Sequence, residues 1–148
     1  TATAHAGPLI RDVSSMTAPS GRWQGEATDS RLSRGIDFVG DMNGDGLDDL
    51  AIGAHKMDLD AGKVYVIFGS NTPFAPSAGR PGSLNGSNGF TIVGPSAGAD
   101  VGFAVAAADD FNGDGRADLI VSSTTESANT ASIYVIFGRT TYPAVLHL

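Results

Sequence analysis

Two short acidic runs carry the residues of this chain that could do chemistry. The first reads DMNGDGLDD over residues 41–49, and the second reads DFNGDGRAD over residues 110–118. Each run offers side-chain oxygens at positions one, three, five and nine, a glycine at position six and a backbone carbonyl at position seven. Such alternating hard donors suit calcium, whereas magnesium demands a tighter octahedron and zinc prefers histidine or cysteine. The sequence therefore predicts two calcium sites, with the ligands Asp41, Asn43, Asp45, the carbonyl of Leu47 and Asp49 in the first, and Asp110, Asn112, Asp114, the carbonyl of Arg116 and Asp118 in the second.

Two other interpretations of the acidic runs are weaker. An Asp-Gly turn that only closes a hairpin uses the same residues, but two copies in register disfavour that explanation. An EF-hand or a dockerin-type module needs an acidic ligand at position twelve and a helix on each side. Position twelve is Ile52 or Val121 here, inside an expected strand. Each loop is therefore expected to join strand to strand and to be closed by its ninth-position aspartate.

The acidic runs belong to an internal repeat of 69 residues, since position 110 repeats position 41. LAIGA is followed by VYVIFG in the first copy, and LIVSS by IYVIFG in the second. These apolar runs favour buried strands, and no segment of ten or more residues keeps a helical apolar period without Gly or Pro. The chain is predicted to be all-β, with about four strands in each repeat. The expected strands are 35–40, 48–54, 64–69 and 89–94 in the first repeat, 102–108, 117–123 and 133–138 in the second, and one spare strand at 21–26.

The order of these motifs resembles the FG-GAP repeat of integrin α-subunit β-propellers and of many bacterial surface proteins. The similarity rests on an apolar strand, the D-x-N-G-D-G-x-x-D-L run, and then IGA and VYVIFG, and it covers about residues 20–148. The resemblance implies that each repeat is one propeller blade, with calcium bound between its first and second strands by the ligands given above. His55 and Ser123 depart from the small or proline residues usual after the second strand.

Two blades are too few to close a propeller, which typically has 4–8 of them. Residues 1–19 are expected to form an N-terminal extension, 20–94 the spare strand and the first blade, and 95–148 a second blade that lacks its last strand. One hypothesis is a homo-oligomer in which the strand at 21–26 completes the second blade of a neighbouring chain by head-to-tail strand exchange. The other is a piece of a longer propeller. The residues fit both hypotheses equally.

Composition narrows the classes of partner. The formal net charge is −7, and nine of the sixteen acidic residues fall within 37–49 and 109–118. Nucleic acid is not an expected partner, because no basic stripe could meet its phosphates. Membrane insertion is not expected either, because no run approaches the ~18 apolar residues of a spanning helix. The chain has no cysteine, which excludes disulfides and thiolate metal sites.

The expected function is a calcium-binding β-propeller module with a structural or adhesive role, outside the cell or at its surface. Millimolar calcium would saturate even weak sites there. No catalytic constellation supports an enzyme, and His55 is expected to pack rather than react. The alternatives are an oligomeric sugar-binding lectin propeller and a non-catalytic fragment of a larger calcium-dependent propeller enzyme. For a protein or saccharide ligand, Trp23 and Tyr142 are the aromatic residues within reach, whereas Tyr65 and Tyr134 are expected in the core.

Overall fold

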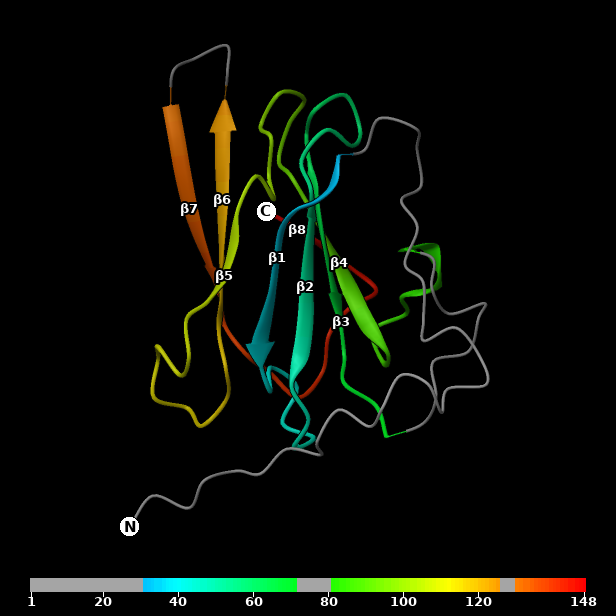
Figure 1. Cartoon of the computed structure of the whole chain (residues 1–148), viewed down its shortest axis with the longest axis vertical. Helices are drawn as coiled ribbons and strands as arrows, with labels where there is room; N and C mark the ends of the chain where they lie inside the picture. The colour runs from blue at the N-terminus through cyan, green and yellow to red at the C-terminus, as the bar shows by residue number, and fades with distance from the viewer. Residues whose placement is uncertain (1–30, 72–80, 126–129) are drawn as a thin grey trace, which may run out of the picture.

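The computed structural model describes residues 31–71, 81–125 and 130–148. Within these ranges the regular structure is β-strand, apart from one short 3₁₀ turn at Pro81–Ser83. The strands form two sheets that lie next to each other (Figure 1). The fold is all-β, as the sequence predicted. In the described ranges no helix has the length and apolar character needed to cross a membrane.

The first sheet has five strands in the order β1-β2-β3-β4-β8. Its first four strands follow one another in the chain and pair antiparallel, as in a propeller blade. The fifth strand, β8, comes from the far end of the described chain and runs parallel to β4. The strands are β1 (Leu32–Gly40), β2 (Asp49–Ala54), β3 (Lys63–Ile67), β4 (Gly89–Val93) and β8 (Val145–His147).

The second sheet has three antiparallel strands in the order β5-β6-β7. They are β5 (Val105–Ala107), β6 (Leu119–Thr125) and β7 (Thr130–Ile136). The pairing of β6 with β7 extends over seven positions, whereas β5 pairs with β6 over three. Among the described residues no strand pairs with the outer edge of β7.

The seven strands expected from the two repeats correspond to β1 through β7, with boundaries that move by up to three residues. The spare strand expected at 21–26 lies outside the described residues. The sequence analysis did not predict β8, because three residues are too few to show a strand period. Its register with β4, in which Leu146 lies opposite Ile92, joins segments far apart in the chain.

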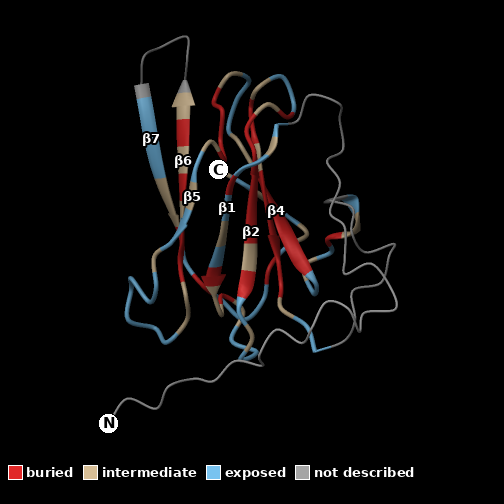
Figure 2. Ribbon diagram, in the orientation of Figure 1, coloured by how far each residue is buried: buried red, intermediate tan, exposed pale blue. Residues whose placement is uncertain are grey.

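Alternation along the strands divides the core into two clusters. One face of the first sheet packs against the second sheet, in a cluster that includes Val64, Val66 and Val121. The opposite face carries its own cluster, which includes Ile52 and Tyr65. Tyr65 is only 1% exposed, as expected for a core residue. Figure 2 shows that β2 and β4 are mostly buried, whereas β7 is largely exposed.

The two sheets approach most closely where Gly53 of β2 faces Gly102, just before β5. A Cβ atom on Gly53 would meet the backbone carbonyl of Gly102. Gly102 has a φ of 85° and donates its N–H to the carbonyl of Ser122 at 3.0 Å. Because only glycine fits both positions, this contact fixes how the second sheet sits on the first.

Candidate metal centres

The first acidic run forms a tight loop between β1 and β2. Asp41 Oδ1 accepts the backbone N–H groups of Gly44 at 2.7 Å and of Asp45 at 3.0 Å. Asp41 Oδ2 accepts the N–H of Gly46 at 2.7 Å. Both glycines have a left-handed φ, 82° and 87°, which a residue with a Cβ adopts only with strain. The loop backbone is therefore wound around the carboxylate at position one.

The side chains at positions three and five are ordered within the same loop. Asn43 Oδ1 accepts the N–H of Asp45 at 2.9 Å, and Asn43 Nδ2 donates to Asp45 Oδ2 at 3.0 Å. Asp45 Oδ1 accepts the N–H of Leu47 at 2.9 Å. Each of these oxygens carries a second lone pair, so the bonds to the backbone position the donors without using them up.

The second loop, between β5 and β6, repeats this arrangement. Asp110 accepts the N–H groups of Asp114 at 2.8 Å and of Gly115 at 2.9 Å, through different carboxylate oxygens. Asn112 Nδ2 donates to Asp114 Oδ2 at 3.1 Å, and the N–H of Arg116 donates to Asp114 Oδ1 at 3.0 Å. This loop also contains an ion pair, because Arg116 Nη1 lies 3.2 Å from Asp114 Oδ1.

The ninth-position aspartates are buried, and each connects its loop to the strand hairpin behind it. Asp49 has no exposed surface; its Oδ2 accepts the N–H of Met42 and its Oδ1 that of Gly69, both at 2.9 Å. Asp118 is equally buried, and its Oδ1 accepts the N–H of Gly138 at 2.8 Å. Gly69 and Gly138 follow the third strand of their blades. Position nine therefore ties the loop to the sheet, whether or not it also binds a metal.

The surroundings of the loop carboxylates shift two pKa values in opposite directions. Burial raises the pKa of Asp49 to about 6, with a further contribution from the carboxylates of Asp45 and Asp41, while its two backbone N–H partners act the other way. The carboxamide of Asn112, helped by Arg116, holds the pKa of Asp114 below its usual value. Burial therefore disfavours the charged form of the Asp49 carboxyl.

The two loops also touch each other. The N–H of Ala117 donates to the carbonyl of Asp41 at 3.0 Å, although these residues belong to different repeats. In Figure 1 both loops lie at the lower end of the sheets. The contact places the two acidic runs side by side across the boundary between the blades.

The predicted ligands lie in two equivalent loops, one in each repeat. Within the described ranges no three His, Asp or Glu side chains converge as a metal cluster. The loop carboxylates instead accept hydrogen bonds from the backbone of their own loops. The donors are all oxygens, which fits a hard cation such as calcium and not zinc. The assignment of the ligands therefore remains a prediction.

Two side chains outside the loops can be compared with the sequence analysis. Tyr142, which the sequence suggested could reach a ligand, is largely buried but lines the pocket described below. The ring is 8% exposed and stacks on Phe90 at a centroid distance of 4.1 Å and an interplanar angle of 11°. His55 packs as expected: it is 1% exposed and meets the ring of Phe103 edge-on at 5.4 Å. Trp23 lies outside the described residues.

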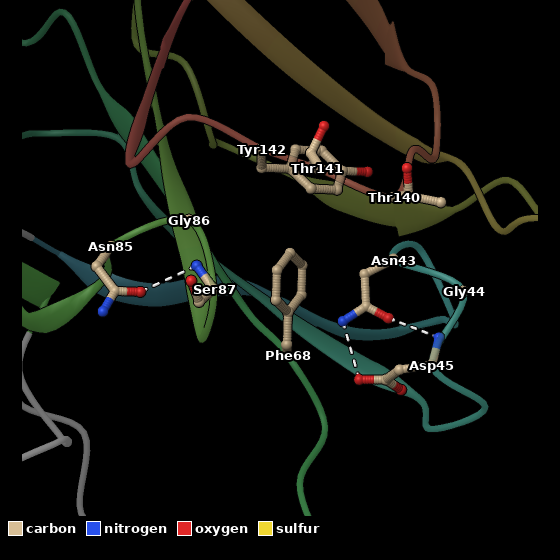
Figure 3. Close-up of a pocket in the computed structure, with 10 residues that line it drawn as sticks. All are labelled: Asn43, Gly44, Asp45, Phe68, Asn85, Gly86, Ser87, Thr140, Thr141 and Tyr142. Carbon is tan, nitrogen blue, oxygen red and sulfur yellow. Dashed lines mark hydrogen bonds between the residues drawn. The ribbon is translucent and has the colours of Figure 1, made fainter.

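A pocket of about 480 Å³ lies beside the first acidic loop (Figure 3). Four segments form it: the loop itself, Phe68 just after β3, the turn before β4, and the segment that links β7 to β8. Sequence reasoning missed this pocket, because no periodicity or motif connects segments so far apart. The residues that line it are Asn43, Gly44, Asp45, Phe68, Asn85, Gly86, Ser87, Thr140, Thr141 and Tyr142.

The fold and the loops define a class of protein, an all-β repeat protein of propeller blades with an acidic loop between the first and second strands of each blade. The family model of the FG-GAP repeat matches residues 38–67 and 101–136. The chain therefore carries two FG-GAP repeats, and each match contains one of the acidic loops. Such repeats are typical of extracellular domains. A search of curated proteins finds no significant match to the chain.

Proposed function

We propose that this chain is a calcium-binding β-propeller module with a structural and adhesive role, outside the cell or at its surface. The observation that carries the proposal is the repeated loop. Two segments, 41–49 and 110–118, wind the backbone around the same oxygen donors with the same pattern of hydrogen bonds. A turn that only reverses the chain does not need three carboxylates, which repel one another unless a cation offsets their charge.

The residues of each loop would have two roles, to bind the calcium ion and to anchor the loop to the sheet. In the first loop, the side chains of Asp41, Asn43 and Asp45 would supply oxygens, and Asp49 anchors the loop to Gly69 at the end of the hairpin. Calcium, when bound, supplies the positive charge that offsets the carboxylates. Because the unfolded chain does not hold these donors together, binding stabilises the folded state by about 2.7 kcal/mol per site at a hundredfold excess over Kd.

The contact between the loops supports a structural role. Since Ala117 of one loop bonds to Asp41 of the other, ordering either loop also orders the boundary between the blades. Calcium would then stabilise the arrangement of the blades as well as each blade. An adhesive module needs such a rigid scaffold to present its surface loops.

Chemical unfolding in millimolar calcium and in excess chelator tests the proposal. We expect calcium to stabilise the parent protein by a few kcal/mol. Asp45→Asn should remove the part of this stabilisation that the first calcium site contributes. Asp48→Asn is the matched control, because Asp48 is an exposed acid in the same loop but outside the ligand set. Equal stability of the parent in calcium and in chelator would overturn the proposal. An equal loss of calcium response in both variants would contradict the assignment of Asp45.

The exposed outer side of the second blade supports assembly with further copies. Ile133 is 72% exposed and Phe137 is 48% exposed, whereas their equivalents in the first blade, Val64 and Phe68, are 0% and 7% exposed. Within the described ranges the edge of β7 also lacks a partner strand. An unpaired strand edge beside exposed apolar side chains, such as Ile133 on β7 and Phe137 just after it, favours the addition of a strand from another chain.

We therefore propose a homo-oligomer that forms head to tail at β7. Light scattering in calcium and in chelator measures its mass. A discrete oligomer, lost on replacing Ile133 with Lys, is expected. A monomer at all concentrations would overturn the assembly and leave the calcium proposal standing.

A further inference from the structure

The pocket beside the first acidic loop has the features of a ligand site. We propose that it binds a neutral saccharide. Its volume of about 480 Å³ falls within the ~300–1,000 Å³ usual for sites of small molecules. This inference goes beyond the calcium-binding module proposed above, and the two sites share Asn43 and Asp45.

The residues that line the pocket are mostly polar, with two aromatic side chains, Phe68 and Tyr142. In Figure 3 the ring of Phe68 stands between the Asn85–Ser87 turn on one side and the Asn43–Asp45 segment on the other. Thr140 and Thr141 lie across from these walls. The ring of Phe68 packs against that of Tyr142 at a centroid distance of 5.5 Å. The site thus combines a small apolar surface with polar groups on several sides.

Each wall is held in place before any ligand arrives. In the turn, Asn85 Oδ1 accepts the N–H groups of Ser87 at 2.9 Å and of Asn88 at 3.3 Å. The segment after β7 is anchored to the first loop, because the N–H of Arg139 and the hydroxyl of Tyr142 both donate to the carbonyl of Met42. Rigid walls reduce the entropy that a ligand would otherwise lose by ordering them.

Several polar groups in these walls remain available for a ligand. Ser87, Thr140 and Thr141 are exposed, and their hydroxyls bond to no residue in the described part of the chain. A hydroxyl both donates and accepts, as do the hydroxyls of a sugar, and side-chain amides offer the same pairing. The C–H groups of a sugar ring suit the small aromatic surface at Phe68.

Charge and desolvation disfavour an anionic ligand and an apolar ligand. Asp45 lines the pocket, and Asp41 lies in the same loop, so an anion would be repelled. An apolar ligand would cover the three hydroxyls without replacing their bonds to water, which is unfavourable. Asp45 is the one carboxylate among the lining residues and already belongs to the proposed calcium loop, so the rest of the pocket offers neutral groups. A neutral polyhydroxyl compound satisfies all of these conditions.

Titration calorimetry and saturation-transfer NMR on the full chain test the site. The probes are cellobiose, maltose, lactose and N,N′-diacetylchitobiose, with glucuronic acid and spermidine as charged comparisons. We expect at least one neutral disaccharide to bind, and the double variant Ser87→Ala/Thr141→Val to weaken it at least fivefold. Thr124→Val on β6 is the matched control and should bind like the parent. Both altered hydroxyls are exposed and unpaired, so the double variant should keep the fold.

The possible outcomes separate the saccharide site from the calcium proposal. Binding that needs Ser87 and Thr141 supports the site, whether or not the protein binds calcium. Absence of binding by every neutral probe overturns it, as does binding that the double variant leaves unchanged. Binding by glucuronic acid or spermidine alone overturns the assignment to neutral sugars. Because Asn43 and Asp45 line the pocket and also belong to the proposed calcium ligands, each titration is run both in calcium and in excess chelator, and the stability effect of calcium is measured separately by unfolding.

Discussion

Replacement of Tyr142 by alanine tests whether the segment from 139 to 148 is a stable part of the first blade. The Tyr142 ring is stacked on Phe90 and packs against Phe68, and its hydroxyl joins the N–H of Arg139 to the carbonyl of Met42. We expect Tyr142→Ala to release this segment from the sheet, because no other aromatic residue of the segment replaces those contacts.

The size of the effect follows from the burial of the ring. Removing a buried aromatic side chain typically costs about 3–5 kcal/mol, through lost contacts and the cavity that remains. Tyr142 is 8% exposed and lies near the surface, so we expect the lower half of that range. Tyr142→Phe keeps the ring and removes only the hydroxyl, which should cost about 0.5–1.5 kcal/mol.

Urea unfolding, combined with hydrogen exchange, measures both consequences. The N–H of Thr91 donates to the carbonyl of Ala144 at 2.9 Å, and that of Leu148 donates to Val93 at 3.2 Å. These two amides should lose protection in Tyr142→Ala and keep it in Tyr142→Phe. A loss below about 1 kcal/mol in the alanine variant, with unchanged exchange at Thr91, would refute the conclusion that the ring holds β8 on β4.

Two further predictions concern the contact between the sheets and the buried histidine. Gly53→Ala places a methyl group against the backbone of the second sheet and should lower the free energy of unfolding in urea by about 1–3 kcal/mol or more. Gly82→Ala is the control, because its methyl group meets no atom within 4 Å and should change that free energy little. Equal losses in the two variants would contradict the close approach of the sheets. Burial lowers the pKa of His55 below its ordinary 6.5, so its contribution to stability is complete above pH 6.5 and declines as the pH falls below that value. Between pH 7.5 and 5.5 the parent should therefore lose more stability than His55→Gln, and parallel pH profiles would count against this assignment.

Much of the fold could be predicted from local patterns. The repeat at 69 residues, the runs VYVIFG and IYVIFG, and the turn residues of the acidic loops each express a preference of a short segment. Local preferences set strand positions because side-chain alternation and left-handed glycines act over a few residues. The same holds for positions one, three and five of each loop, whose hydrogen bonds span at most five residues.

The candidate site was predictable only in part. The sequence placed Asp49 in the ligand set, and the structure adds that this carboxylate is buried and bonded to Gly69, twenty residues away. Nothing in the local sequence distinguishes a buried aspartate that anchors the loop from an exposed aspartate that binds a metal. The contact of Ala117 with the carbonyl of Asp41 likewise depends on how two separate loops meet.

The sequence by itself determined the class of the fold, the two blade repeats and the residues of both acidic loops, because these are properties of contiguous segments. Only the tertiary structure decided that the chain returns from β7 to pair β8 with β4, that Tyr142 is buried, and that a polar pocket forms beside the first loop. These features come from contacts between residues about fifty to one hundred positions apart, such as that of Tyr142 with Met42. Their stability depends on the packing of the whole molecule, which no short pattern encodes.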